Sequence, residues 1–283
     1  MKKLLTLLLA LVAVLGVSAQ IVTPQPSPFS KVEQRVGLTD ITLEYSRPSM
    51  RGRTIVGGLE PYGEIWRTGA NARTKITFST DVMVNGQTLK AGSYAILTKP
   101  GAENWDVYFY TEYDGNGATI EWDDDKVATK INIDVYPLPM DIETFTMTFD
   151  DLTNSSVNLG IMWENVYIGV PIKLPTDNMV LASINNAMNG TPTASDYFNA
   201  AVYYLQENKN IERAKEWIDK AISMSGNNLQ YWQLRQQSLI YAKAGDKAGA
   251  IAIAKKGLVA AEAAGNPDYV KLNKDSLKEW GAM

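Results

Sequence analysis

The hydrophobic pattern of the chain changes its period once, near Leu174, and this change constrains the fold more than any other feature. Before it, apolar and polar residues alternate in short runs, which is typical of strands with one buried and one exposed face. After it, apolar residues recur every three or four positions, which is typical of amphipathic helices. The sequence therefore predicts an α+β protein with two domains, an antiparallel, jelly-roll-like β-sandwich followed by an α-helical repeat-like domain.

Turn residues separate the alternating runs of the first domain, which we place at residues 20–174. The runs cover residues 41–45, 76–78, 105–109, 131–135, 145–149, 157–163 and 168–172. The pair Asn85-Gly86 suits a two-residue hairpin, because both residues tolerate positive φ. Many short strands at this spacing favour an antiparallel sandwich over a parallel sheet.

Helix start and stop signals fill the rest of the chain. A connecting segment, 175–192, holds one short helix, and the second domain, 193–283, holds five more. The expected first residues or caps are Asp177, Thr193 or Ser195, Asn210, Gln230, Asp246 and Asn266. Ala214 and Ala250 lie in equivalent places of two helical pairs, so this domain resembles tetratricopeptide helical hairpins with two extra residues in each unit. Unrelated helix packing is the alternative.

The amino terminus has the three parts of a secretory signal peptide, which we assign to residues 1–19. Lys2 and Lys3 precede an apolar run from Leu4 to Val17, and small residues end at Ala19. The run of about 14 residues is shorter than the roughly 20 that span a bilayer. We expect an exported, soluble protein, periplasmic or extracellular, with no membrane span after cleavage. An uncleaved membrane anchor is the alternative.

The chain contains no histidine and no cysteine, which excludes many kinds of site. Disulfides, zinc sites built on these residues, and Ser-His or Cys-His catalysis all require them. No glycine-rich nucleotide motif is present, and 27 basic against 31 acidic residues do not favour nucleic acid. The acidic run 121–125, with Asp114 and Asn116, could bind calcium, but its spacing does not fit an EF-hand loop. We expect a solvated loop there, no metal and no cofactor.

Six of the eight arginines lie between Arg35 and Arg73. Residues 46–59 read S-R-P-x-x-x-G-R-x-I-x-G-G-L, and residues 61–74 read P-Y-G-x-x-W-R-x-G-A-N-x-x-T. This segment, with Gly92-Ser93-Tyr94 and Trp105, resembles the bacterial exported family called domain of unknown function 2911, over about residues 29–174. Some members of that family also resemble this chain in carrying helical repeats after the β domain. The resemblance implies no reaction, so it assigns no catalytic residue.

The arginine-rich segment supplies the candidate ligand-binding residues. Guanidinium groups bind carboxylate, sulfate or phosphate at two points, aromatic rings suit a sugar ring, and a carboxyl can accept from a hydroxyl. The candidates are Arg47, Arg51, Arg53, Tyr62, Glu64, Trp66, Arg67 and Asn71. The alternative is structural: the arginines pair internally with Glu44, Glu60 and Glu64 and fix an irregular loop, and Trp66 belongs to the core.

These features favour an exported binding or scaffold module without catalytic activity. An anionic or glycan ligand would bind the arginine and aromatic segment, and a protein partner would bind the helical domain. The alternative is a carboxylate-dependent hydrolase that acts on envelope or extracellular glycans, since such chemistry needs no histidine. The sequence leaves the oligomeric state open.

Overall fold

The computed structural model describes residues 23–115, 117, 120–226 and 229–283, and the predicted signal peptide lies outside these residues. The chain forms two compact units, of which the first ends at Asp177 and the second begins at Asn178. The first unit contains all the named strands and the second contains most of the helical residues, as the change of period near Leu174 predicts.

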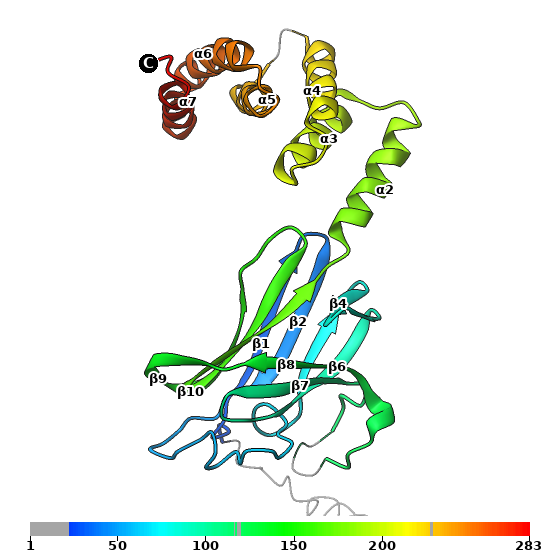
Figure 1. Cartoon of the computed structure of the whole chain (residues 1–283), viewed down its shortest axis with the longest axis vertical. Coiled ribbons are helices and arrows are strands. Elements are labelled where there is room, and N and C mark those ends of the chain that lie inside the picture. Colours follow the sequence, from blue (N-terminus) through cyan, green and yellow to red (C-terminus); the bar gives the residue numbers. More distant parts are fainter. Residues whose placement is uncertain (1–22, 116, 118–119, 227–228) are drawn as a thin grey trace, which may run out of the picture. The chain divides into compact units, whose positions relative to one another are not determined.

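The first unit contains two antiparallel sheets, so the predicted β-sandwich is confirmed (Figure 1). The six-stranded sheet has the order β1 (Phe29–Val36), β2 (Thr39–Ser46), β3 (Thr74–Phe78), β6 (Gly92–Lys99), β7 (Asn104–Tyr110) and β8 (Val127–Asp134). The four-stranded sheet has the order β5 (Gln87–Leu89), β4 (Val82–Val84), β10 (Ser156–Lys173) and β9 (Tyr136–Asp150). A 3-10 helix, η1 (Asp124–Lys126), precedes β8.

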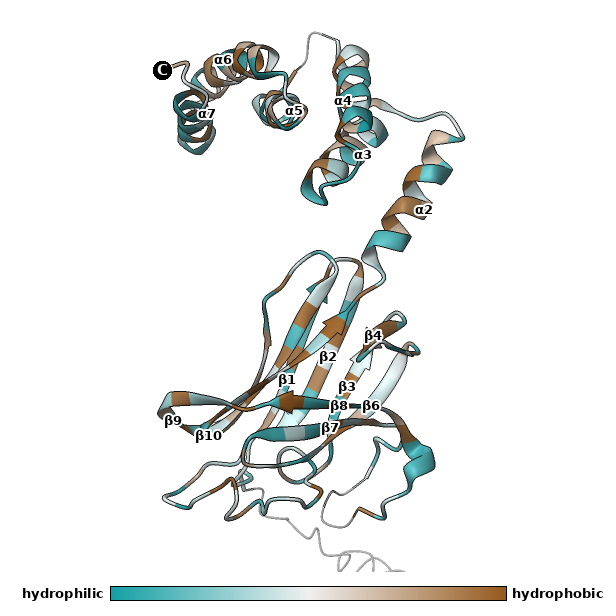
Figure 2. Ribbon diagram, viewed as in Figure 1, coloured by the Kyte–Doolittle hydropathy of each residue, from teal (hydrophilic) through white to brown (hydrophobic). Residues whose placement is uncertain are grey.

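The inner faces of the two sheets form one hydrophobic core. Burial alternates along β2, where Ile41, Leu43 and Tyr45 are buried, and Figure 2 shows hydrophobic segments alternating with hydrophilic ones along the strands. Alternation is the expected consequence of strand geometry, since successive side chains point to opposite faces. The polar residues between them therefore face away from this core.

The hairpin between β4 and β5 has the predicted two-residue turn. Asn85 has φ of 50° and Gly86 has φ of 73°, and Val84 pairs with Gln87 across the turn. Positive φ at both central residues is the feature of the turn whose twist matches that of the flanking strands. The prediction from this dipeptide is confirmed.

β10 is a single strand of 18 residues whose pairing with β9 is irregular at Glu164. Burial falls on odd-numbered residues as far as Trp163 and on even-numbered residues from Val166 onward. Glu164 has φ of 52°, and the register with β9 shifts on both sides of it. The extra residues of this irregularity lie in β9, where residues 137–146 face residues 162–166 of β10. In β10 the positive φ of Glu164 interrupts the extended geometry and the buried face changes there, which explains why the sequence shows two alternating runs of opposite phase.

The helices are α2 (Thr176–Met188), α3 (Ala194–Gln206), α4 (Ile211–Ser225), α5 (Tyr231–Lys243), α6 (Lys247–Ala263) and α7 (Pro267–Glu279). Successive helices contact each other as α3 with α4, α5 with α6, and α6 with α7. Ala214 and Ala250 are fully buried, as close packing of neighbouring helices requires. This arrangement is consistent with tetratricopeptide-like hairpins. Among the described residues, no helix combines the length and apolar character that a bilayer crossing needs.

Most of the predicted helix starts agree with the structure. Thr193, Asn210, Asp246 and Asn266 are N-cap residues whose side chains accept a backbone N–H, as residues with short polar side chains do at this position. One start differs: α2 begins at Thr176, so Asp177 lies in the first turn of the helix instead of preceding it. An acidic residue in the first turn still interacts favourably with the helix dipole.

Candidate functional site

The arginine-rich segment is the connection between β2 and β3, and it is tied to the strands at several points. Its first part pairs with β9, where Met50 donates its N–H to the carbonyl of Glu143 (2.8 Å) and Phe145 donates to the carbonyl of Pro48 (2.8 Å). Its last part pairs with β6, since Trp66 and Thr98 exchange two backbone hydrogen bonds (2.7 and 2.9 Å). The connection is therefore irregular in shape but fixed in position.

The irregular position in β10, Glu164, provides a further anchor for this connection. The carboxylate of Glu164 accepts the N–H groups of Ile55 (3.1 Å) and Val56 (3.0 Å). Two backbone donors in an irregular segment would otherwise lack a partner, and a carboxylate makes stronger hydrogen bonds than a neutral acceptor. The irregular geometry of β10 and the order of the arginine-rich segment thus depend on the same residue.

Trp66 belongs to the core of the sandwich. Its side chain is 5% exposed, it stacks on Trp163 with 5.7 Å between ring centroids, and its Nε1 donates to the carbonyl of Gly69 (3.2 Å). Trp105 and Phe145 contact its ring edge-on. A ring enclosed in this way offers no surface to a sugar, so we remove Trp66 from the candidate ligand-binding residues.

The guanidinium groups of the segment bond mainly to backbone carbonyl oxygens. Arg51 donates to Pro26 (3.0 Å), Arg53 donates to Met50 and Ser49 (both 2.8 Å), and Arg67 donates to Gly117 (3.2 Å). Arg47 donates to the carbonyl of Phe145 (3.0 Å) and to the hydroxyl of Thr146 (2.7 Å).

The internal ion pairs that the structural interpretation expects are not found in the described part of the chain. None of Arg47, Arg51, Arg53 and Arg67 has a carboxylate within ion-pair distance there, and Glu44 pairs instead with Lys75 (2.8 Å). The arginines do hold the loop, but carbonyl oxygens take the place of the expected carboxylates. Their positive charge is therefore left without a direct counter-charge among these residues.

Three of the candidates, Arg51, Arg53 and Arg67, line one pocket of about 330 Å³ together with Glu60, and we call it the arginine pocket. Its other lining residues include Trp163 from β10 and Gly69 and Ala70 from the loop. The Nε atom of Arg67 is buried and has no hydrogen-bond partner among the described residues. A buried donor without an acceptor is costly.

Glu60 gives the arginine pocket a titratable group near neutral pH. Burial raises the pKa of the Glu60 carboxyl to about 7, and this effect outweighs the opposing influence of the nearby positive charges of Arg67 and Arg53. Desolvation disfavours the charged form of a carboxyl. At neutral pH the pocket therefore combines three guanidinium charges with a carboxyl that is ionised only in part.

The remaining candidates lie outside the arginine pocket. The amide of Asn71 donates to Gln25, Ser27 and Ser46, which ties the residues before β1 to the loop. The ring of Tyr62 is exposed and covers Gly57, where φ is 80° and a Cβ atom would lie 2.5 Å from that ring. Glu64 is exposed, and Arg47 holds β9. These four residues are therefore held by separate contacts among the described residues.

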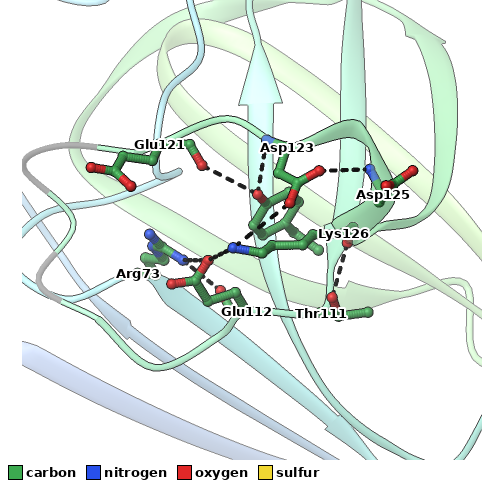
Figure 3. Close-up of polar contacts among 8 residues, drawn as sticks. Arg73, Thr111, Glu112, Glu121, Asp123, Asp125 and Lys126 are labelled. Carbon is green, nitrogen blue, oxygen red and sulfur yellow. Dashed lines mark hydrogen bonds and ion pairs between the residues drawn. The ribbon is translucent and has the colours of Figure 1, made fainter.

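The acidic run 121–125 forms local contacts with cations and backbone groups (Figure 3). Asp123 accepts the N–H of Asp125 (3.0 Å) and so caps η1, and Lys126 lies between Asp123 (4.0 Å) and Glu112 (2.8 Å). Glu112 also lies 3.8 Å from Arg73. In the described part of the chain, no three acidic side chains are grouped so as to hold a metal ion. Asn116, one of the calcium candidates, lies outside the described residues.

Two residues of this region have roles that the sequence does not predict. Glu60 is expected from the sequence only as an ion-pair partner of the arginines, and Glu164 is not among the expected site residues. Glu60 lies in the pocket, and a signal for it exists, because it immediately follows the G-G-L of the motif and precedes Pro61. Glu164 anchors the loop, and its signal is the change of phase between the runs ending at Trp163 and starting at Ile168. Both signals are local, but neither indicates which distant residues these carboxyls contact.

The fold and the pocket together define a class of protein, a β-sandwich whose β2–β3 connection encloses an arginine-lined cavity, followed by helical hairpins. A family model described as "Protein of unknown function (DUF2911)" matches residues 27–172, which include every named strand except the last residue of β10. The chain therefore belongs to this family, as the resemblance of its arginine-rich motif implies. No curated protein and no solved structure shows a significant match to the chain.

Proposed function

We propose that the protein is an exported binding module and that its arginine pocket holds a small anionic ligand. The observation that carries the proposal is the convergence of Arg51, Arg53 and Arg67 on one cavity without a carboxylate ion pair among the described residues. A guanidinium group binds carboxylate, sulfate or phosphate oxygens through parallel hydrogen bonds. Each guanidinium group has five N–H donors, and the hydrogen bonds of these three arginines to described residues use only one or two of them.

The size and chemistry of the pocket limit the ligand. A volume of about 330 Å³ lies at the lower end of the roughly 300–1,000 Å³ that is usual for small-molecule sites. Glu60 donates a proton to a ligand oxygen when it is protonated and repels an anion when it is ionised. Since the pKa of Glu60 is about 7, we expect the anion to bind more tightly at pH 6 than at pH 8, with uptake of a proton.

The proposed export rests on residues 1–19, which lie outside the described residues. A signal peptide cut after Ala19 leaves Gln20 as the first residue of the mature chain. Mass spectrometry of the protein recovered from outside the cytoplasm tests this directly. Recovery of a chain that still begins at Met1 would contradict it.

The helical unit supports a second part of the proposal, a protein partner. Stacked helical hairpins commonly present a surface for an extended peptide, and the chain provides the contacting pairs α3–α4 and α5–α6. Removal of residues 193–283 is therefore expected to abolish capture of this partner without abolishing the binding of anions to the β domain.

The glycan-hydrolase alternative is less well supported. Glycoside hydrolysis generally uses two carboxyl groups on either side of the scissile bond. Among the described residues that line the arginine pocket, Glu60 is the only acid. One carboxyl among three arginines suits the binding of an anion better than this reaction.

Calorimetry with the chain from Gln20 tests the binding proposal. Phosphate, sulfate and galacturonate serve as probes at pH 6 and pH 8. We expect at least one probe to bind, more tightly at pH 6, and expect Arg51→Gln and Arg67→Gln to weaken binding by about tenfold or more, since each removes a charged donor.

Arg35→Gln is the matched control, because Arg35 is an exposed arginine on β1 that pairs with Asp40 outside the pocket. It should bind the probes as the unmodified chain does. The proposal fails if none of the three anions binds, or if the two pocket variants bind as well as the Arg35 variant.

A further inference from the structure

A second pocket, of about 640 Å³, lies on the six-stranded sheet near β6, β7 and β8, and we call it the outer groove. Tyr108 on β7 lies next to Phe109, whose side chain belongs to the main core, so Tyr108 points to the opposite face of this sheet. Aromatic, charged and amide side chains that line the outer groove include Tyr108, Trp122, Asp124, Gln87, Lys99 and Lys130. No arginine lines it in the described part of the chain.

Trp122 is an exposed aromatic ring in a fixed position. It stacks on Tyr110 (5.5 Å between centroids, 26° between planes) and meets Tyr108 edge-on (4.9 Å, 78°). Its Nε1 donates to the carboxylate of Asp124 (2.8 Å). Three contacts hold the ring, yet 37% of the residue remains exposed beside the groove. A pre-ordered apolar surface reduces the entropic cost of binding.

Polar groups in the outer groove can bond to a ligand. Gln87 accepts the hydroxyl of Thr129 (2.6 Å) with its oxygen, and its amide nitrogen has no partner among the described residues. Lys99 has no ion pair in the described part of the chain, whereas Lys130 pairs with Asp106 (2.8 Å). The groove therefore offers nitrogen donors at two lysines and one amide.

The charges in and around the outer groove balance. Lys99 and Lys130 carry two positive charges, and Asp106 and Asp124 carry two negative charges. Asp106 accepts from Lys130 and from the hydroxyl of Tyr108 (3.3 Å), so its charge is already compensated. An ionic ligand would gain little from this balanced set of charges, whereas a neutral ligand with many hydroxyl groups would not need to displace an ion pair.

We propose that the outer groove binds an uncharged carbohydrate of one or two sugar rings. The apolar C–H face of a sugar ring packs against Trp122, as the apolar body of an aromatic side chain permits. The sugar hydroxyls accept from Gln87, Lys99 and Lys130. The volume lies within the roughly 300–1,000 Å³ that is usual for small-molecule sites. This site is independent of the arginine pocket, which takes an anion.

A purely structural role for Trp122 makes different predictions from the proposed binding role. In that role the ring only covers the small apolar cluster around Tyr108 and Tyr110, and the loss of the ring would lower stability without any effect on a ligand. Gln87 distinguishes the two roles, because a ring that only covers the apolar cluster would leave sugar binding independent of Gln87, whose own structural contact in the described part of the chain is the hydrogen bond from Thr129 (2.6 Å).

Ligand-observed saturation-transfer NMR on the chain from Gln20 tests the proposal, with maltose, cellobiose and diacetylchitobiose as probes. We expect at least one disaccharide to bind, and expect Trp122→Ala and Gln87→Ala each to weaken it by about tenfold, which corresponds to roughly 1.4 kcal/mol. Trp232→Ala is the matched control, since Trp232 is an exposed tryptophan (41%) on α5. It should leave the affinity unchanged.

Two binding results would overturn the proposed sugar site. The proposal is overturned if none of the three sugars binds the unmodified chain, or if Trp122→Ala binds as tightly as Trp232→Ala. If circular dichroism shows that Trp122→Ala is unfolded, the Gln87→Ala variant decides, and unchanged binding by it overturns the proposal. Arg51→Gln, which alters the arginine pocket, is expected to bind the sugar normally.

Discussion

Replacement of Glu60 by glutamine tests the electrostatics of the arginine pocket through stability alone. Burial raises the pKa of Glu60 to about 7 in the folded chain, from 4.5 for an exposed carboxyl. Below pH 4.5 the carboxyl is protonated in both the folded and the unfolded state, so it costs nothing. As the pH rises toward 7 and above, folding must bury an ionised group, and stability falls. Glu60→Gln removes this cost, so its advantage appears only at the higher pH.

The size of the change in the free energy of unfolding follows from the two pKa values of Glu60. The difference between 4.5 and about 7 corresponds to about 3 kcal/mol if the full effect is expressed. Glu60 is only partly buried, and water screens the charge of a partly exposed group, so we reduce this to about 1–2 kcal/mol. The free energy of unfolding of Glu60→Gln relative to the unmodified chain should therefore rise by about 1–2 kcal/mol between pH 5 and pH 8.

The composition of the chain reduces the number of other groups that titrate in the pH range of this measurement. There is no histidine or cysteine in the sequence, so no side chain with an ordinary pKa between 5.5 and 8 adds its own titration. Urea unfolding followed by tryptophan fluorescence, in buffers without phosphate or carboxylate, gives the free energy at each pH. Glu64→Gln is the matched control, because Glu64 is an exposed glutamate of the same loop, and it should follow the pH dependence of the unmodified chain.

Two results would refute this reasoning. If the difference between Glu60→Gln and the unmodified chain is the same at pH 5 and pH 8, the carboxyl of Glu60 does not titrate near neutral pH. If Glu60→Gln is less stable than the unmodified chain by nearly the same amount at pH 5 and pH 8, the arginines dominate over burial and Glu60 is ionised throughout this range. In either case the expected tighter binding of an anion at pH 6 would lose its basis.

Three further predictions concern the fold that holds the site, each measured by urea unfolding. Trp66→Ala should lower the free energy of unfolding by about 3–5 kcal/mol, since it removes a closely packed aromatic side chain from the core. A decrease below 1 kcal/mol would contradict the placement of Trp66 in the core. Glu164→Gln should cost about 1–2 kcal/mol, because two backbone donors lose a charged acceptor, and a neutral effect would contradict the anchoring role. Gly86→Ala should lower the free energy of unfolding by about 1 kcal/mol, because residue 86 has positive φ, although a Cβ atom there would contact no other atom. Gly190→Ala is the control, because Gly190 does not have positive φ.

Local signals made the helices and one hairpin predictable from the sequence. Asn210 and Gly226 bound α4 as expected, because a cap acts on groups within three or four residues of itself. The pair Asn85-Gly86 fixed its turn for the same reason, since only its own backbone angles are involved. A structural feature can be predicted from the sequence when the residues that indicate it also make the interactions that form it, as in a helix cap or a two-residue turn.

The arginine pocket could be predicted only in part, because its geometry depends on contacts between distant residues. The motif indicates the arginines, but the acceptors of Arg51 and Arg67, the carbonyls of Pro26 and Gly117, lie far away in the sequence. Trp66 and Arg67 are neighbours in the chain, yet one lies in the core and the other lines the pocket. Alternation along an extended segment produces such a split, but this segment lacks the repeated alternation that marks a strand in the sequence.

The use of main-chain oxygens by Arg51, Arg53 and Arg67 has an evolutionary consequence. Every residue type contributes the same carbonyl group, so substitution of an acceptor residue such as Pro26 or Met50 deletes no acceptor. Lysine cannot reproduce a planar fork that holds two carbonyls at once. Across the family, we therefore expect the arginines to vary far less than the residues whose carbonyls they bind, and an alignment with lysine frequent at the position of Arg53 would contradict this.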